Sequence, residues 1–160
     1  SKSKIFMASF AAKLLVVFIC ECIQLVLMNY IFKVPVGNRI GYLMLFLILA
    51  DLFTLSLGEV FGLYLKGEIS KRENIANALL MTSVFLSGEM IASLPGTFEV
   101  SCPIINDINP ATVLNFAFYN LVYYEDLSGF YQELLKIALA AVVLIVISIV
   151  RLRRQKYASL

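Results

Sequence analysis

The apolar stretch LLKIALAAVVLIVISIV fills residues 134–150, and the basic sequence RLRR follows at once at residues 151–154. A helix needs about 20 apolar residues to cross the hydrocarbon of a bilayer. This stretch is short by about one turn, but its only charged side chain, Lys136, can extend to the interface. Three more runs of suitable length lie at residues 14–32, 40–65 and 75–94. Four such runs predict an all-α polytopic membrane helix bundle.

The overall composition agrees with this interpretation. Of the 160 residues, 61% are hydrophobic and only 15% are charged, which is far from the average of soluble domains. One apolar run would fit the buried core of a soluble protein, but four would not. The composition therefore excludes an ordinary soluble domain.

The distribution of basic residues predicts an orientation. No Lys or Arg occurs between Arg72 and Lys136, although the net charge of the chain is +2. Loops that stay in the cytoplasm carry an excess of Lys and Arg. With the N-terminus inside, ten of the thirteen basic residues are cytoplasmic, and only Lys33, Arg39 and Lys136 lie near the outer face. We therefore predict an integral membrane protein with both termini in the cytoplasm. After an apolar run, the basic tail indicates a stop-transfer signal rather than a patch for nucleic acid or anionic lipid.

With their flanking residues, the four spans are predicted at 5–32, 40–65, 75–94 and 132–151. Pro35 and Gly37 predict a short outer turn between the first two spans, and the dipeptide Pro95-Gly96 is expected to end the third. Residues 98–126 are too apolar for a loop in water and too interrupted for a span. Short re-entrant or interfacial helices are expected there, on the outer side before the last span.

One of these outer helices has a clear start signal. Asn109 is a good N-cap, and Pro110 fits the first helical position, where its missing N–H costs nothing. A helix is predicted from there to about residue 124. It carries several aromatic residues of the kind found at the headgroup level of bilayers: Phe116, Phe118, Tyr119, Tyr123 and Tyr124.

Several chemistries are excluded by what the sequence lacks. It contains no His, which removes His-based triads and His-ligated zinc. No glycine-rich phosphate loop is present, so ATP is not bound by a Walker-type site. Cys20 and Cys22 lie two apart in one helix and cannot pair with each other, and Cys102 is expected alone on the outer side. We therefore predict neither an enzyme nor a resident metal or cofactor.

Four acidic residues lie within the predicted spans: Glu21, Asp51, Glu59 and Glu89. An ionisable group in hydrocarbon is costly unless it faces protein or water, which makes each a candidate functional residue. Glu59 and Glu89 lie near the inner and outer boundaries, so a structural role is favoured for both. For the deeper Glu21 and Asp51, lining a transport pathway and packing within the bundle are equally open.

Two further patterns concern the second span and the connection after it. Asp51, Thr54, Gly58 and Gly62 follow one face of a helix, and the two glycines match the small-xxx-small pattern of close helix packing. The connection at residues 66–74 is rich in charge and is predicted to be a solvated cytoplasmic turn. Its charged residues include Glu68, Lys71, Arg72 and Glu73.

The C-terminal half resembles a known family. The stretch INPATVLNFAFYNLVYY at residues 108–124, then the last span, then RLRRQKY at residues 151–157 resembles the C-terminal end of ABC type-2 permeases. These are the membrane subunits of a class of ATP-binding-cassette exporters. The Leu86-Ser87-Gly88 sequence is similar to the family's Ser-Gly before the outer helices. The resemblance covers essentially the whole chain and is most specific over residues 86–157. It rests on the order in which these sequence features follow one another, not on a single motif.

The resemblance implies one permease domain over residues 1–160, as the last four of six spans of a longer protein. The chain's start at Ser1, without a Met, also favours a fragment. Glu89 departs from the family pattern, because an apolar residue is expected there. The family context implies a bacterial or archaeal plasma membrane and no role for nucleic acid. It also implies a permease that pairs in the lipid with a second permease, as a homo- or heterodimer, and docks separate ATPase subunits.

The resemblance also implies roles for individual residues. The substrate pathway would run along the permease interface and involve Glu21, Asp51, Thr54, Gly58 and Gly62. The outer helices would close it, with Pro103, Asn109, Pro110, Phe116, Tyr119 and Tyr123 as the gate. The ATPase-facing loop would contain Glu68, Lys71, Arg72 and Glu73. The resemblance does not identify the cargo, because the fold does not fix it.

Two other functions fit the same sequence. A small four-span proton-coupled carrier would use Glu21 as the exchange site and would work without ATP. A non-transporting membrane scaffold would only assemble other subunits. Association with an ATPase distinguishes the ABC permease from the carrier, and loss of transport after neutralising Asp51 argues against the scaffold.

Overall fold

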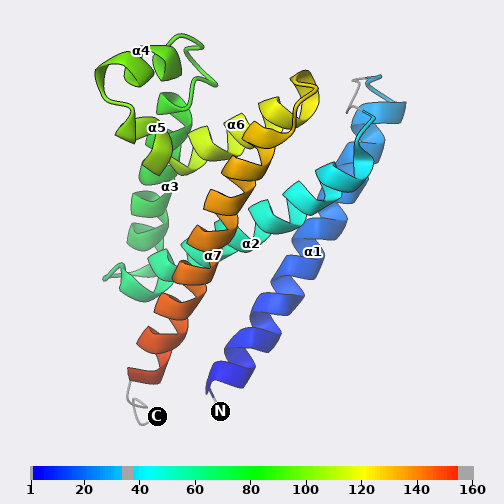
Figure 1. Ribbon diagram of the computed structural model, residues 1–160. Coiled ribbons are helices and arrows are strands. Elements are labelled where there is room, and N and C mark those ends of the chain that lie inside the picture. Colours follow the sequence, from blue (N-terminus) through cyan, green and yellow to red (C-terminus); the bar gives the residue numbers. More distant parts are fainter. Residues whose placement is uncertain (1, 34–37, 155–160) are drawn as a thin grey trace. The chain divides into compact units, whose positions relative to one another are not determined.

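The regular structure of the chain consists of helices. The computed structural model describes residues 2–33 and 38–154, and these contain no strand. The prediction of an all-α fold is therefore confirmed for the described residues. The helices, labelled in Figure 1, are α1 (Lys2–Tyr30), α2 (Ile40–Tyr64), α3 (Ile69–Leu86), α4 (Leu94–Ser101), α5 (Ile104–Ile108), α6 (Pro110–Tyr123) and α7 (Ser128–Arg154). The predicted turn at Pro35 and Gly37 lies outside the described residues.

The chain divides into two compact units. The first unit comprises α1, α2 and the part of α7 from Ala138 onward. The second unit, Leu65–Ile137, contains α3, α4, α5, α6 and the beginning of α7.

Three helices are long and apolar enough to cross a membrane within the described ranges. They are Lys4–Tyr30 of α1 with 27 residues, Ile40–Tyr64 of α2 with 25, and Ser128–Arg154 of α7 with 27. At a rise of about 1.5 Å per residue, each exceeds the hydrocarbon thickness of about 30 Å. Helices suit this environment because their backbone groups bond within the segment.

The third predicted span differs from the structure. No single helix covers residues 75–94: α3 starts earlier, at Ile69, and ends at Leu86. Gly88 then adopts a positive φ of 91°, which a helix cannot accommodate. The dipeptide Pro95-Gly96, expected to end a span, instead lies at the start of α4, where Pro fits the first turn. With 18 residues and three charges in its first five, α3 is too charged to be counted with the long apolar helices.

The first unit is held together by packing between α1 and α2. Its buried apolar side chains include Phe10 on α1 and Leu43, Phe46 and Phe53 on α2. Most of the remaining surface of α1 is open, since only 6% of its most apolar stretch is buried. Such a helix, apolar on nearly every side, is typical of a membrane span facing lipid or a partner helix.

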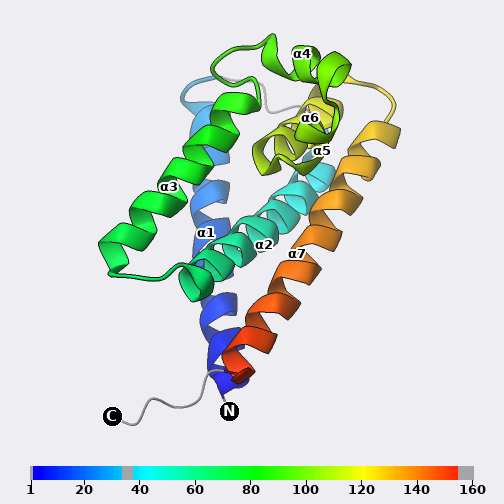
Figure 2. The same ribbon diagram turned by 90° about the vertical axis from the view of Figure 1, so that its left-hand side faces the viewer.

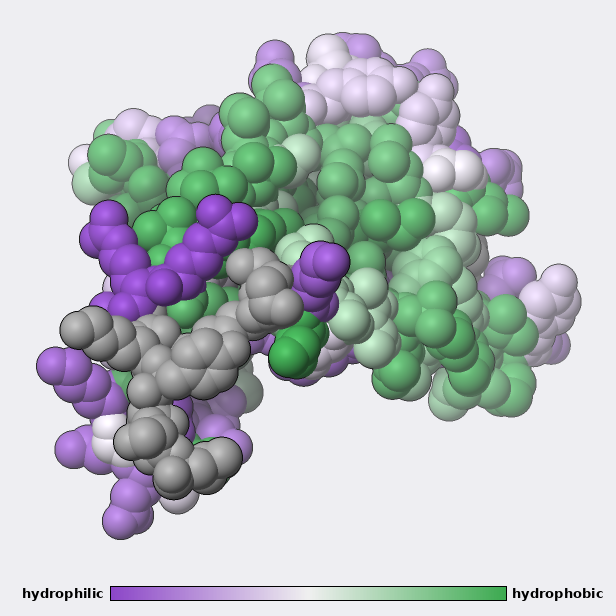
Figure 3. All heavy atoms as spheres, turned by 90° about the horizontal axis from the view of Figure 1, so that it is seen from below, coloured by the Kyte–Doolittle hydropathy of each residue, from purple (hydrophilic) through white to green (hydrophobic). Residues whose placement is uncertain are grey.

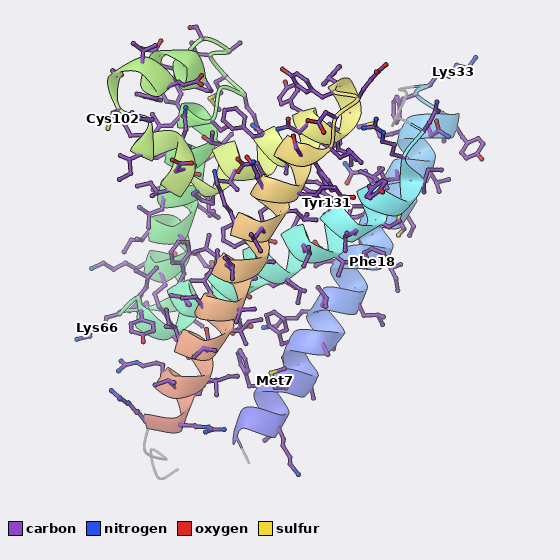
Figure 4. The ribbon with its side chains drawn as sticks, in the orientation of Figure 1. Met7, Phe18, Lys33, Lys66, Cys102 and Tyr131 are labelled. Carbon is purple, nitrogen blue, oxygen red and sulfur yellow. The ribbon has the colours of Figure 1, made fainter. Side chains whose placement is uncertain are left out.

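In this first unit, the start of α1 and the end of α7 lie at the same end, as both Figure 1 and Figure 2 show. Met7 lies near the start of α1, and Lys33 lies just beyond its far end (Figure 4). Figure 3 looks at the molecule from the end where α1 starts. In this view, hydrophobic side chains cover much of the face, and hydrophilic side chains lie mainly toward its edges.

The second unit is organised around α6. One face of α6 is buried and consists of Thr112, Val113, Ala117 and Leu121. Its neighbours in this unit are α3 and α5. The early part of α7 adds the fully buried Phe130 and Ile137. The short helices are therefore packed elements and not a loose loop.

Candidate functional site

The deepest polar contact of the first unit joins α1 and α2. The side chains of Glu21 and Asp51 form a hydrogen bond with each other. Asp51 is only 2% exposed, and one carboxyl oxygen of each residue, Glu21 Oε2 and Asp51 Oδ2, is buried without another hydrogen-bond partner among the described residues. A carboxylate has no donor, so a hydrogen bond between two carboxyl groups requires a proton on one of them. The pair can therefore hold a proton inside the helix pair.

A second polar contact lies further along the same interface. Lys13 Nζ donates to Glu59 Oε1 at 2.6 Å, and the side chains are 52% and 20% exposed. Lys13 precedes Glu21 by eight residues, and Glu59 follows Asp51 by eight, so both pairs share one antiparallel register. Eight residues correspond to about 12 Å along a helix. The structural role predicted for Glu59 therefore has a definite partner in Lys13.

The residues predicted to line one face of α2 lie in different environments. Asp51 is buried against α1, whereas Thr54, Gly58 and Gly62 are exposed. Thr54 Oγ1 donates to the carbonyl of Ala50 on its own helix, at 2.9 Å. A Cβ added at either glycine would meet no heavy atom within 4 Å beyond the local helix backbone. The Cβ positions of both glycines are therefore open among the described residues.

At the far end of α2, Tyr64 meets the basic end of α7. The Arg151 guanidinium lies over the Tyr64 ring, 5.1 Å from its centroid. Together with Arg153 and Arg154, Arg151 forms the last turn of α7. Cations at a helix C-terminus are favourable, and a cation over a tyrosine ring adds to this.

The connection after α2 is shorter than predicted. Only residues 65–68 are non-helical, because α3 begins at Ile69. The turn predicted at 66–74 is therefore wrong for Lys71, Arg72 and Glu73, which lie in the first turns of α3. Glu68 is the N-cap residue but makes no side-chain cap. Lys, Arg and Glu lose little rotamer freedom in a helix, so the charge run is compatible with the start of α3.

The predicted start of α6 is confirmed. Asn109 is its N-cap and accepts a hydrogen bond from the backbone N of Ala111 at 3.2 Å, with Pro110 in the first turn. The same side chain also reaches α3. Asn109 Nδ2 donates to the carbonyl of Ser83 at 2.9 Å, and Ser83 Oγ donates to Asn109 Oδ1. At 6% exposure, Asn109 is a buried polar joint between α3 and α6.

Three further contacts fix the segment between these helices. Asn115 Nδ2 of α6 donates to Ser87 Oγ at 3.3 Å, and Asn106 Nδ2 of α5 donates to the carbonyl of Pro95 at 2.8 Å. A Cβ on Gly88 would lie 2.7 Å from the Pro95 ring, so glycine is needed there for space as well as for φ.

The other predicted gate residues are distributed over the second unit. Pro103 precedes α5 as its N-cap residue, close to the free Cys102, which lies between α4 and α5 (Figure 4). Tyr119 and Tyr123 are 53% and 70% exposed and stack at 5.4 Å between ring centroids. Phe116 is half-buried on the same helix. The structure thus brings Phe116, Tyr119 and Tyr123 to one helix but not Pro103.

The beginning of α7 carries two charged contacts. Lys136 Nζ lies 2.8 Å from Asp107 Oδ1 of α5 and 3.0 Å from Glu133 Oε1. Ser128, the first residue of α7, donates to the Asp126 carboxyl from its Oγ at 2.5 Å and from its backbone N at 3.0 Å. These hydrogen bonds hold the pKa of Asp126 below its usual range. Lys136, expected to extend to the interface, is thus ion-paired.

Sequence reasoning missed the partners of the predicted residues. Ser83, Asn106 and Asn115 were not singled out, although each contributes a side-chain hydrogen bond between segments. The only available signal was the concentration of small polar and amide residues on both sides of the short helices. Such residues often satisfy backbone groups at helix ends.

Taken together, three long apolar helices, largely uncovered, define an integral membrane protein of all-helical architecture. No protein-family model, curated protein or solved structure matches the chain.

Proposed function

We propose that the chain is the membrane permease subunit of an ATP-binding-cassette exporter. It would form the substrate pathway with a second permease, and separate ATPase subunits would hydrolyse the ATP. The observation that carries the proposal is the role of Asn109. This residue belongs to the Asn-Pro-Ala sequence on which the family resemblance rests, and it both caps α6 and bonds to Ser83 of α3.

The second unit supports a mechanism for this function. One compact unit holds the charged start of α3 and, at its other end, the short helices α4, α5 and α6. We assign the charged start to the ATPase and the short helices to the outer gate. Movement of Lys71 and Glu73 would then pass along α3 to Ser83, and through Asn109 to α6. A buried polar joint transmits such motion better than lipid-exposed apolar packing, because it has a defined geometry.

The first unit supports the proposed orientation. The start of α1 and the end of α7 lie at one end, and Arg151, Arg153 and Arg154 stand in the last turn of α7. We assign this end to the cytoplasm of a bacterium or archaeon, in keeping with the positive-inside rule. The polar connection after Tyr64 would lie on the same side. In this arrangement, α3 and the short helices together take the place of a fourth span.

The open glycine face of α2 supports pairing with a second permease. Gly58 and Gly62 permit close approach of a helix, and no heavy atom of the described chain occupies the Cβ positions within 4 Å. The neighbouring Thr54 would then face the permease interface. Glu21 and Asp51 would border the same pathway from inside the α1–α2 pair.

A charge swap in α3 tests the proposal. Lys71→Glu with Glu73→Lys keeps the net charge, and both side chains are exposed. We expect co-purification of the ATP-binding-cassette ATPase to fall at least about tenfold, because like charges facing a partner cost several kcal/mol. The measurement is the ATPase recovered with the tagged chain from detergent extracts.

The matched control is Lys33→Glu with Glu99→Lys, which also keeps the net charge but changes no residue of α3. It should leave ATPase recovery unchanged. Recovery that is equal for both swaps would contradict the assignment of the docking segment. Failure of the unaltered chain to retain any such ATPase would contradict the proposed function itself.

A second candidate function rests on the Glu21–Asp51 contact. Two carboxyl groups joined by a hydrogen bond inside a helix pair suit a proton-coupled carrier, in which protonation drives exchange. This candidate needs no ATPase, so the co-purification experiment separates it from the exporter. The non-transporting scaffold has no particular observation in its favour.

A further inference from the structure

The second unit contains a cavity of about 420 Å³ between the end of α3 and α6. Its walls include Ser87, Glu89 and Pro95 on one side and Asn115, Phe116 and Tyr119 on the other. Cavities of about 300–1,000 Å³ are typical of small-molecule sites. The side chains that line this cavity include polar and acidic groups, which the walls of an ordinary apolar gap lack.

The cavity carries an acidic group and no basic group. Glu89 is the ionisable acid of its wall, and its exposed side chain forms no ion pair with any described residue. No Lys or Arg occurs between Arg72 and Lys136, and Lys136 is already paired with Asp107 and Glu133. The carboxylate of Glu89 is therefore available to a cation from outside the chain.

Aromatic rings provide the second element of recognition. Phe116, Tyr119 and Tyr123 of α6 line the cavity, and the two tyrosine rings stack with an interplanar angle of 27°. The negative faces of such rings attract organic cations, with the strongest effect when water is partly excluded. The same rings bury the apolar groups that surround an alkylated ammonium.

Polar atoms at the rim complete the cavity. Asn115 uses its Nδ2 to donate to Ser87 Oγ, which leaves the partial negative charge of its Oδ1 to attract a cation. The position of Glu89 is fixed by the turn before it, where Gly88 takes a φ of 91° and lies against the Pro95 ring. The acid, the rings and the amide oxygen therefore belong to residues that line one cavity.

We propose that this cavity binds an organic cation, an alkylammonium or quaternary ammonium group, with its charge between Glu89 and the aromatic rings of α6. The group is either a free small molecule or the headgroup of a choline-type lipid. This assignment goes beyond the exporter function and does not depend on it, because binding is measured without transport. It also gives Glu89, which departs from the family pattern, a definite role.

The test is calorimetric titration of the full chain in nanodiscs of phosphatidylglycerol, a lipid without an ammonium group, with benzyltrimethylammonium as the probe. We expect saturable binding to the unaltered chain. Glu89→Gln should weaken it at least about tenfold, and Tyr119→Leu about threefold or more. Tyr119→Phe keeps the ring and should bind as the unaltered chain does.

Controls separate recognition of the charge from nonspecific effects. Glu99→Gln removes one carboxylate from the same unit outside the cavity and should not change binding. The neutral isostere neopentylbenzene should bind at least tenfold more weakly than the cation. Helical circular dichroism and gel filtration confirm that each variant is folded. A second titration in phosphatidylcholine nanodiscs identifies the source: weaker apparent binding assigns the cavity to the lipid headgroup, and equal binding to a free cation.

Three results would overturn the proposal. One is the absence of saturable binding to the unaltered, folded chain. Another is equal affinity of the unaltered chain for the cation and its neutral isostere, which would make the cavity merely apolar. The third is an equal effect of Glu89→Gln and Glu99→Gln, which would reduce the role of Glu89 to general surface charge.

Discussion

Glu21→Ala is expected to destabilise the folded chain by about 3 kcal/mol, because it leaves the buried Asp51 without its hydrogen-bond partner. Replacing both residues, as Glu21→Leu with Asp51→Leu, should return stability to within about 1 kcal/mol of the unaltered chain. The reason is that removing both polar partners leaves no unsatisfied group. The measurement is reversible unfolding in mixed micelles, with the single and double variants analysed as a cycle.

A conservative variant separates structure from function in this pair. Glu21→Gln keeps a hydrogen bond to Asp51, because an amide N–H₂ can donate to a carboxyl oxygen, but it cannot take up a proton. Its stability should stay close to that of the unaltered chain. Proton uptake in proteoliposomes would be lost in this variant if the chain is a proton-coupled carrier, whereas an ATP-driven exporter would keep its ATPase-dependent activity. If the single Ala variant is as stable as the double Leu variant, the two carboxyl groups do not interact.

The second large effect is expected at the joint between α3 and α6. Asn109→Ala removes the N-cap of α6 and both hydrogen bonds to Ser83, which should cost about 2–4 kcal/mol. The loss should be local to the second unit. Amide hydrogen exchange should therefore accelerate in α6, and the melting temperature should fall. Under the proposed function, export would decline with it.

Two comparison variants define this effect. Asn109→Asp keeps the cap acceptor but loses the Nδ2 donor to the Ser83 carbonyl, so its cost should be intermediate. Asn120→Ala removes the same kind of side chain from α6, but Asn120 donates only to Phe116 of its own helix, so the cost should stay below about 1 kcal/mol. Equal losses for Asn109→Ala and Asn120→Ala would show that the joint to α3 adds nothing.

Local signals account for the parts of the fold that could be predicted. The apolar runs identify α1, α2 and most of α7, because the length and hydropathy that a membrane span needs can be read from a single segment. The Asn109-Pro110 dipeptide predicts the start of α6 because capping involves only neighbouring residues. The same locality explains the error at α3. The apolar run continues past Leu86, but the positive φ of Gly88 and its contact with Pro95 end the helix there.

The contacts between segments could not be predicted from the sequence. Glu21 and Asp51 are thirty residues apart, and their meeting depends on the register in which α1 and α2 pack. Two candidate acids in separate spans give no indication that their side chains meet. Likewise, nothing near Asn109 identifies Ser83 as its partner, and the cavity beside Glu89 exists only because α6 lies against the end of α3. Residues so far apart in the sequence form no local pattern from which their contact could be predicted.

The orientation of the chain in the membrane is the claim on which the exporter proposal most depends. Two single-cysteine variants test it, Glu99→Cys on α4 and Lys66→Cys after α2, both made after Cys20, Cys22 and Cys102 are replaced by Ser. Both positions are exposed. A membrane-impermeant maleimide applied to intact cells should label the cysteine at position 99 at once, and the one at position 66 only after permeabilisation. Labelling in the opposite order, or equal labelling of both positions in intact cells, would contradict the account.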